Sequence, residues 1–462
     1  MPDIAVLKRN KIPILLALIS VAFYLSFGYD LLRTDYIKLV SLYVALFFLF
    51  YKLVQIDKEN FKSLTVLAVL FRLLFLFAIP NLSQDYFRFI WDGRMILASF
   101  NPYLYTPESF ILNGQFPIFQ AQELYSGMGI LNGSHLSNYT PFNQLIFVFA
   151  GLISGKSVLG SVIVMRVFII AADLGTLYFG KKFLERLNLP VHNIFWYILN
   201  PFIIIELTGN LHFEGVMIFF LIWSLYLLHS GKWEWAAVIF ACSVSIKLIP
   251  LIFLPLFFQR FMMKEGGTAN SIIKGSLYLF GFYGIILGIL LLSFLPFYNS
   301  ELVVNYIDTI GLWFHRFEFN ASFYYVARAI GYTFRGYNEI AVIGKYIPKV
   351  IIVCILILTF FRRNKTTTEL ITAMLFAISF YYFMATTVHP WYLSTLLILS
   401  LFTKYRFPLV WSLVIILSYL AYTNVDNTEN LWIIGFEYSI VYGFLVWEIL
   451  IKEKGHLKGS LV

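Results

Sequence analysis

Two carboxylates and two guanidiniums fall within one short polar stretch, residues 81–105, which follows an apolar run. They are Asp85, Asp92, Arg88 and Arg94, and aromatic residues lie between them. A helix over residues 85–99 would place Asp85, Arg88 and Asp92 at i, i+3 and i+7, on one face. An acid beside a cation, on a face rimmed with rings, is suited to binding a sugar and a phosphate.

The composition decides which elements must position these groups. The chain has 462 residues, of which 60% are hydrophobic and 13% charged. A soluble domain cannot bury that much apolar surface, so the sequence predicts an all-α, polytopic integral membrane protein. The net charge of +9 comes from short basic clusters between apolar runs, which indicates membrane topology rather than nucleic-acid binding. Both cysteines lie in apolar runs and provide no disulfide framework.

The basic clusters also predict the orientation of the chain. Lys8–Lys11 and Lys52–Lys62 flank the first apolar runs, and the positive-inside rule places them in the cytoplasm. Three crossings then put the polar stretch outside. Two short aromatic segments, 142–153 and 321–332, are expected to be surface helices. About fourteen crossings result, with both termini inside: 13–27, 39–53, 64–80, 162–180, 194–207, 216–229, 235–248, 249–258, 275–296, 342–361, 370–387, 391–402, 409–422 and 432–451.

These spans form one membrane domain in three parts. Residues 1–80 hold the N-terminal spans, 81–160 form a helical extracytoplasmic loop with the candidate catalytic motif, and 161–462 complete the bundle. The expected location is the inner (cytoplasmic) membrane, with the site on its extracytoplasmic side.

This topology brings distant polar residues to one membrane face. His212, Glu214, Lys247 and His389 are separated from one another, and from Asp85, by an even number of predicted crossings. An ionisable group left unpaired at the membrane costs several kcal/mol, so each is a functional candidate. Their convergence predicts a single extracytoplasmic cavity.

Several motifs carry a family resemblance, in the order QDYFRFIWDGRMILASFNPY, NYTPFNQLIF, LNPFIIIELTGNLHFEG, SIKLIPLIFLP and HPWYL. The chain resembles the polytopic GT-C glycosyltransferases, and within them the bacterial mannosyltransferases that use polyprenyl-phosphate mannose (the glycosyltransferase 87 group). It is more distantly similar to the catalytic subunit of GPI mannosyltransferase I. The resemblance covers roughly residues 83–392. Two features depart from the pattern: His212-Phe213-Glu214 stands where the bacterial group often has His-Asn-Asp, and two additional spans precede the loop.

The resemblance implies an inverting transfer of a hexose, with mannose as the expected sugar, from a polyprenyl-phosphate donor to an acceptor hydroxyl. As in inverting glycosidases, a carboxylate must deprotonate the nucleophile, and Asp85 is the candidate base. Cations must stabilise the departing phosphate. The candidates for that role are Lys247, Arg88, Arg94, Arg316 and Arg166. The candidates for sugar or acceptor binding are Asp92, Trp91, Tyr103, His212, Glu214, His389, Trp391 and Tyr392.

Each candidate also has a structural alternative. Asp85 would cap the N-terminus of its helix, Asp92 would pair with Arg88, and Arg94 would extend to the interface. Lys247 would be a membrane anchor. Arg166 and Asp173, at i and i+7, would form a structural network, and Trp391 and Tyr392 would belong to an aromatic belt.

The same features predict the binding partners and the other classes of protein that must be considered. The expected partners are the lipid-linked donor, a lipid- or glycan-linked acceptor and membrane lipids, with no nucleic acid; the sequence leaves the acceptor and the oligomeric state open. No compact ligand motif is present, so the sequence predicts no metal and no cofactor, although a divalent cation stays an alternative. A transporter or flippase should show internal repeats, which we do not find. A polysaccharide polymerase or ligase, with large outer loops, is the closer rival.

Overall fold

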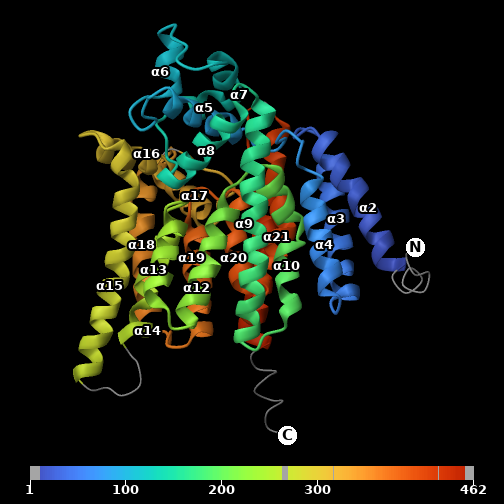
Figure 1. Ribbon diagram of the computed structural model, residues 1–462, viewed down its shortest axis with the longest axis vertical. Helices are drawn as coiled ribbons and strands as arrows, with labels where there is room; N and C mark the ends of the chain where they lie inside the picture. Colours follow the sequence, from blue (N-terminus) through green and yellow to red (C-terminus); the bar gives the residue numbers. More distant parts are fainter. Residues whose placement is uncertain (1–10, 263–268, 316, 425, 453–462) are drawn as a thin grey trace.

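The protein is a helical bundle with a helical cap at one end, as its computed structural model shows (Figure 1). The structure describes residues 11–262, 269–315, 317–424 and 426–452. Within these ranges every regular element is helical, and one isolated β-bridge joins Phe319 to Thr387. The all-α prediction is confirmed.

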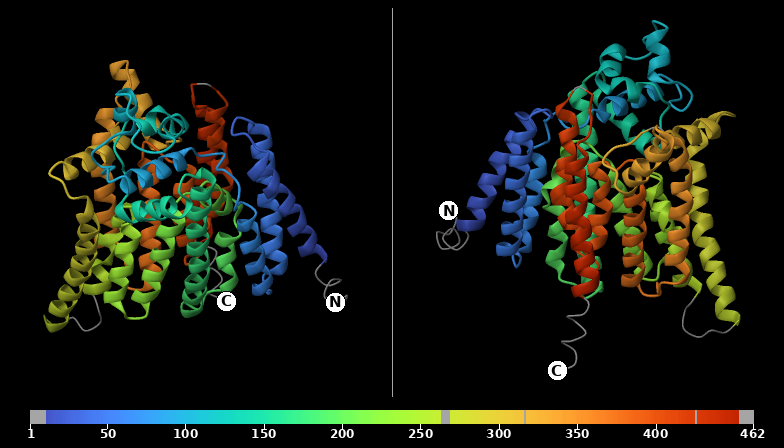
Figure 2. Two further views of the ribbon diagram at one scale, coloured as in Figure 1. Left: turned by 45° about the horizontal axis from the view of Figure 1, so that its top comes forward. Right: turned by 180° about the vertical axis from the view of Figure 1, so that it is seen from behind.

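The first three helices form one edge of the bundle, opposite α15 (Figure 2). They are α2 (Lys11–Tyr29), α3 (Tyr36–Asp57) and α4 (Phe61–Leu73). The side chain of Asp35 caps α3, and that of Asn60 caps α4. Asn81 Nδ2 donates hydrogen bonds to the carbonyl oxygens of Phe27 and Leu31. The α2–α3 turn is therefore tied to the segment that leads into the cap.

The cap consists of four helices: α5 (Asp85–Leu97), α6 (Pro107–Leu112), α7 (Ala121–Gly133) and α8 (Pro141–Ser154). The predicted helix 85–99 corresponds to α5, and the predicted surface helix 142–153 to α8. Thr106 caps α6, and prolines occupy the first turns of α6 and α8, where no amide hydrogen bond is lost.

The rest of the chain forms the bundle. Its elements, in order, are α9 (Val158–Arg186), η1 (Val191–Ile194), α10 (Phe195–Ile198), α11 (Pro201–Ile203), η2 (Ile204–Gly209), α12 (Glu214–His229), α13 (Trp233–Val244), η3 (Ile249–Phe257), α14 (Phe258–Met262), α15 (Ala269–Phe294), η4 (Leu295–Phe297), α16 (Leu302–His315), α17 (Phe323–Arg335), α18 (Ile340–Phe360), α19 (Thr367–Met384), η5 (Pro390–Tyr392), α20 (Leu393–Ser400), α21 (Phe407–Val414), η6 (Ile415–Thr423), α22 (Leu431–Trp447) and η7 (Glu448–Lys452).

Within the described ranges, fewer helices are long enough to cross a membrane than the predicted number of crossings requires. Among the described residues, seven helices are long and apolar enough to cross a membrane. An eighth candidate is the pair Val191–Ile198 and Pro201–Gly209, which is bent by 48°. Other predicted spans are shorter helices, such as Glu214–His229 and Trp233–Val244. At 1.5 Å per residue, Glu214–His229 reaches about 24 Å, less than the hydrocarbon thickness. The multi-pass prediction is confirmed, and the count of about fourteen is not.

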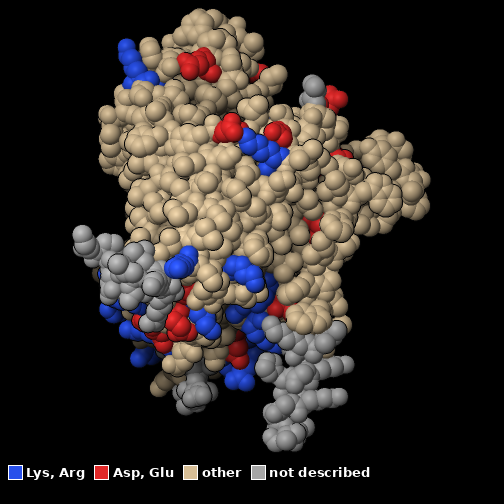
Figure 3. Space-filling model, turned by 90° about the vertical axis from the view of Figure 1, so that its right-hand side faces the viewer, with Lys and Arg blue, Asp and Glu red and all other residues tan. Residues whose placement is uncertain are grey.

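The two ends of the bundle differ in charge. In Figure 3, Lys and Arg gather over the lower end, while the cap end is largely free of them on this face. Contacts between basic segments support this: Arg186 Nη1 donates to Ser230 Oγ, Arg260 Nη1 donates to the Lys365 carbonyl, and the Lys181 ammonium lies 4.8 Å from the Phe61 ring centroid. The predicted cytoplasmic clusters therefore share the end opposite the cap.

Candidate functional site

A cavity of about 1030 Å³ lies between the cap and the bundle. Seven of the sequence-predicted residues line it: Asp85, His212, Glu214, Lys247, His389, Trp391 and Tyr392. They come from four separate segments of the chain. The structure thus brings Asp85, Lys247 and His389 to one chamber, as the even number of predicted crossings requires.

Asp85 is the first residue of α5 and is half-buried at the cavity. Gln84 is the N-cap residue and forms no side-chain cap, while Asp85 lies in the first turn, where the helix dipole favours an acid. The carboxylate accepts a hydrogen bond from Asn132 Nδ2, at 3.1 Å. Burial raises the pKa of Asp85 above its usual value, while the Asn132 hydrogen bond and the charges of Lys247 and Arg33 oppose that rise. A raised pKa makes this carboxylate a better proton acceptor.

Lys247 forms an ion pair with Glu214, which is buried at the N-terminus of α12. The backbone just before Lys247 is attached to the cap. Thr140 Oγ1 donates to the carbonyl oxygens of Ser245 and Ile246, at 2.6 and 2.7 Å, and Asn143 Nδ2 donates to Ile246. The loop after α13 is thereby fixed, and the ammonium group lies 5.8 Å from the Tyr392 ring centroid.

A column of stacked rings forms one wall of the cavity. The ring centroids of His212 and Trp391 are 3.7 Å apart, and those of Trp391 and His389 are 4.5 Å apart, with nearly parallel planes. Phe319 continues the stack beyond His389, at 5.1 Å, and Tyr422 follows, at 5.7 Å. Flat apolar faces with polar edges suit the faces and hydroxyls of a pyranose.

Arg33 ends this column and was not among the sequence candidates. Its guanidinium lies 4.0 Å from the Tyr422 ring centroid, and its Nη1 donates to the Leu82 carbonyl. Arg33 lines the cavity, as do Asn132 and His135 of the cap. One signal was available: Arg33 lies in a loop that the topology places outside, against the positive-inside tendency.

The backbone that carries His212 is unusual. The segment η2 is π-helical, and Leu211, directly before His212, has a φ of 62°. This left-handed conformation is strained for a bulky residue. Arg166 holds the segment by donating to the carbonyl oxygens of Thr208 and Gly209, both at 2.8 Å. Leu82 N donates to Asn210 Oδ1 and joins the segment to the start of the cap.

Arg166 is therefore not a phosphate ligand in this structure. It is fully buried, and its three nitrogens bond to the carbonyl oxygens of Thr208, Gly209 and Leu76. Asp173 accepts from Arg72 Nε at 2.7 Å and from Thr208 Oγ1, so Arg166 and Asp173 belong to a structural network, as the structural interpretation predicts. Arg72 and Arg166 both stabilise the packing of helical segments against one another.

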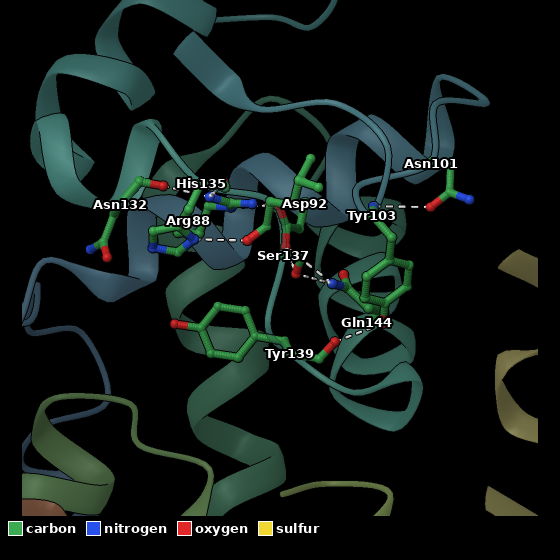
Figure 4. Close-up of polar contacts among 10 residues, drawn as sticks. Arg88, Asp92, Asn101, Tyr103, Asn132, His135, Ser137, Tyr139 and Gln144 are labelled. Atoms are coloured by element: carbon green, nitrogen blue, oxygen red, sulfur yellow. Dashed lines mark hydrogen bonds and ion pairs between the residues drawn. The ribbon is translucent and has the colours of Figure 1, made fainter. Parts of the chain in front are cut away.

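Arg88 and Asp92 form a buried ion pair at 2.8 Å rather than lining the cavity (Figure 4). Arg88 Nη1 also donates to the carbonyl oxygens of Asn132 and His135. Asp92 accepts from Ser137 Oγ as well. Asp92 therefore pairs with Arg88, as its structural alternative predicts. The pair positions the loop that carries Asn132, the hydrogen-bond partner of Asp85.

Three more candidates lie outside the cavity lining. Arg94 Nη1 donates to the Phe119 carbonyl and Nη2 to the Lys156 carbonyl, so the guanidinium holds the cap together. The Tyr103 hydroxyl donates to the Tyr139 carbonyl (Figure 4). Trp91 is buried in the hydrophobic core. Arg316 lies outside the described residues.

A set of apolar side chains also lines the cavity. These side chains come mainly from η3 and α18, with Ile249, Ile252, Pro255, Pro348, Ile351 and Ile355 among the residues. Asp85 and Lys247 line the same cavity, so a single ligand can contact both charged and apolar side chains there.

The described part of the chain offers no cluster of metal-binding side chains. There, no group of three or more His, Cys, Asp or Glu side chains is arranged to hold a metal ion. The expectation of a metal-free reaction stays a prediction.

The fold and the cavity define a multi-pass helical membrane protein with a capped chamber that combines an acid, cations and stacked rings. Residues 20–263 match the MptA_B family model, described as alpha-(1->6)-mannopyranosyltransferase, N-terminal domain. This match covers more than half of the chain, and the chain belongs to that family. It is a mannosyltransferase, and its resemblance to the GT-C mannosyltransferases of the glycosyltransferase 87 group is confirmed. No curated protein matches the chain.

Proposed function

We propose that the chain transfers mannose from a polyprenyl-phosphate donor to an acceptor hydroxyl, with inversion at the anomeric carbon. The acceptor oxygen attacks that carbon from the side opposite the phosphate, and Asp85 takes the hydroxyl proton. The bond between the anomeric carbon and the phosphate oxygen breaks, and its electron pair stays on the phosphate. The products are the mannosylated acceptor and polyprenyl phosphate.

The observation that carries this proposal is the composition of one cavity. Its lining includes the charged side chains of Asp85 and Lys247 together with a set of apolar side chains from η3 and α18. A lipid-linked sugar has the same combination, with a polar head and a long apolar tail. A water-soluble nucleotide-sugar donor has no use for the apolar side chains.

Other side chains that line the cavity suit the binding of the donor phosphate and of the sugar. Lys247 is available to contact the phosphate as a point charge, and Tyr392 lies beside its ammonium group. His212, Trp391 and His389 offer ring faces and edges to the sugar. Because the leaving group is a phosphate, which departs as an anion, no general acid is required, and we propose that Lys247 stabilises it without a divalent metal.

The distribution of charge supports an extracytoplasmic site. The basic segments share the end opposite the cap, and such segments face the cytoplasm in most membrane proteins. We therefore place the cap and its cavity at the outer face of the inner membrane.

The test is mannose transfer from radiolabelled polyprenyl-phosphate mannose in membranes that contain the full chain. Asp85→Asn should lower the rate about 10²- to 10⁴-fold, as expected for loss of a general base. Glu123→Gln, which changes an exposed carboxylate of the cap, is the matched control and should keep the native rate. A native rate in Asp85→Asn would remove Asp85 as the base, and no transfer by the native chain would reject this donor.

A further inference from the structure

The two additional N-terminal spans deliver a cation to the cavity. Arg33 lies in the loop between α2 and α3, and it lines the chamber together with Asp85 and Lys247. The loop is held there by the hydrogen bonds from Asn81 to Phe27 and Leu31. A chain that began directly at the cap would lack this side chain.

Arg33 has no carboxylate partner among the described residues. The acids of its own loop are engaged elsewhere: Asp30 pairs with Lys38 at 2.6 Å, and Asp35 caps α3. The other cation lining the described cavity, Lys247, is paired with Glu214. Glu318, which also lines the cavity, is paired with Arg328 at 2.8 Å. Within the described ranges Arg33 therefore forms no ion pair, although the carboxylates of Asp85 and Asp426 line the same cavity.

The neighbours of Arg33 position the guanidinium without neutralising it. One face lies over the Tyr422 ring, and Nη1 donates to the Leu82 carbonyl. Both partners are uncharged, and both restrict the side chain. A guanidinium held in this way is pre-organised to donate paired hydrogen bonds to a phosphate.

The proposed reaction brings one obligatory anion into the cavity, and that anion gains charge. The donor phosphodiester carries a single negative charge, whereas the released monoester carries about −1.5 to −2 at pH 7. The Lys247–Glu214 pair has no net charge to offset this gain. A second cation is required where the phosphate departs.

We propose that Arg33 binds the phosphate of the lipid-linked donor, together with Lys247. This inference rests on the proposed function for the nature of the donor. It assigns a role to the N-terminal hairpin, which supplies part of the donor site. Arg33 takes the place of Arg88, Arg94 and Arg166, which do not line the cavity.

The test measures binding of polyprenyl phosphate to the purified full-length chain, which needs no turnover. Arg33→Gln should weaken this binding about 10- to 100-fold, the effect expected for loss of a charged hydrogen bond. Arg33→Lys should restore part of it, because it keeps the charge. Lys38→Gln, which removes a cation of the same hairpin that does not line the cavity, should bind as the native chain does. Thermal unfolding of each variant separates lost binding from lost folding.

Steady-state transfer gives the second readout. Arg33→Gln should raise the KM for the donor, lower kcat and leave the KM for the acceptor unchanged. Equal binding of polyprenyl phosphate by the native chain and Arg33→Gln would overturn the inference, as would an effect confined to the acceptor KM. Failure of the native chain to transfer mannose while Arg33-dependent binding persists would instead reject the proposed reaction and leave the phosphate site in place.

Discussion

Asp85 illustrates how a single residue is adapted by its surroundings. Its carboxylate is half-buried, accepts a hydrogen bond from Asn132 and lies within the fields of Lys247 and Arg33. Burial outweighs these stabilising partners, so the pKa is raised. By contrast, burial and the charge of Arg88 lower the pKa of His135 to about 4, so this cavity-lining imidazole is neutral at pH 7. Burial favours the neutral form of both groups, which raises the pKa of the acid and lowers that of the base.

The raised pKa of Asp85 predicts a pH dependence of activity and of stability. Activity should fall as the pH drops through this pKa, because the protonated carboxyl cannot act as a base. The folded state binds this proton more tightly than the unfolded state, so the contribution of Asp85 to stability declines as pH rises past its unfolded pKa. Asp85→Asn should therefore raise the midpoint of thermal unfolding at pH 7 while lowering activity.

A pH–rate profile and thermal unfolding in detergent measure these two effects. The profile of Glu123→Gln, whose carboxylate lies away from the cavity lining, should overlay the native one. A lower unfolding midpoint in Asp85→Asn would show that the ionised carboxylate stabilises the fold, contrary to the argument from burial.

At the scale of elements, the crossing of α5 and α8 decides how the cap is closed. A Cβ atom at Gly93 would lie 2.3 Å from the carbonyl oxygen of Phe147. The obstructing atom belongs to the backbone, so it cannot move as a side chain would. Glycine at this position allows the two helices to approach closely. The sequence alone did not reveal this role, because Gly93 appeared there only as one residue of a longer motif.

Gly93→Ala should destabilise the protein by about 1–3 kcal/mol, the usual cost of overpacking. The measurement is the free energy of unfolding, with mannose transfer followed in parallel because α5 begins at Asp85. Gly284→Ala in α15 is the control, since a Cβ there meets nothing within 4 Å; it should be neutral or slightly stabilising. Equal stability of the two variants would argue against the close crossing.

The whole molecule is polarised, with the cap at one end and basic segments at the other. If the cap faces away from the cytoplasm, a cysteine placed in it should react with an impermeant thiol reagent added to intact cells. Gln122→Cys on α7 and Glu59→Cys between α3 and α4 are both exposed positions. We expect labelling of Gln122→Cys alone, in a background where Cys242 and Cys354 are replaced.

The two positions serve as mutual controls, because permeabilised cells should label both. Labelling of Glu59→Cys alone in intact cells would invert the orientation and move the proposed reaction to the cytoplasmic face.

The sequence by itself determined the class of protein, the helix at Asp85 and the sharing of one chamber by Asp85, Lys247 and His389. Hydropathy and basic clusters are local properties of the chain, and the parity of crossings follows from them. The number of membrane spans was harder to predict from the sequence. Helices that end at the cavity, such as Glu214–His229, are shorter than a bilayer requires.

Only the tertiary structure decided which cations reach the cavity. Arg88, Arg94 and Arg166 were candidate phosphate ligands, yet besides the local Arg88–Asp92 pair they donate to carbonyl oxygens 25 to 90 positions away in the chain. Arg33 looks ordinary in the sequence, yet the α2–α3 hairpin places it against Tyr422. A guanidinium binds whatever acceptors the fold brings within reach, and spacing along the chain does not encode these long-range contacts.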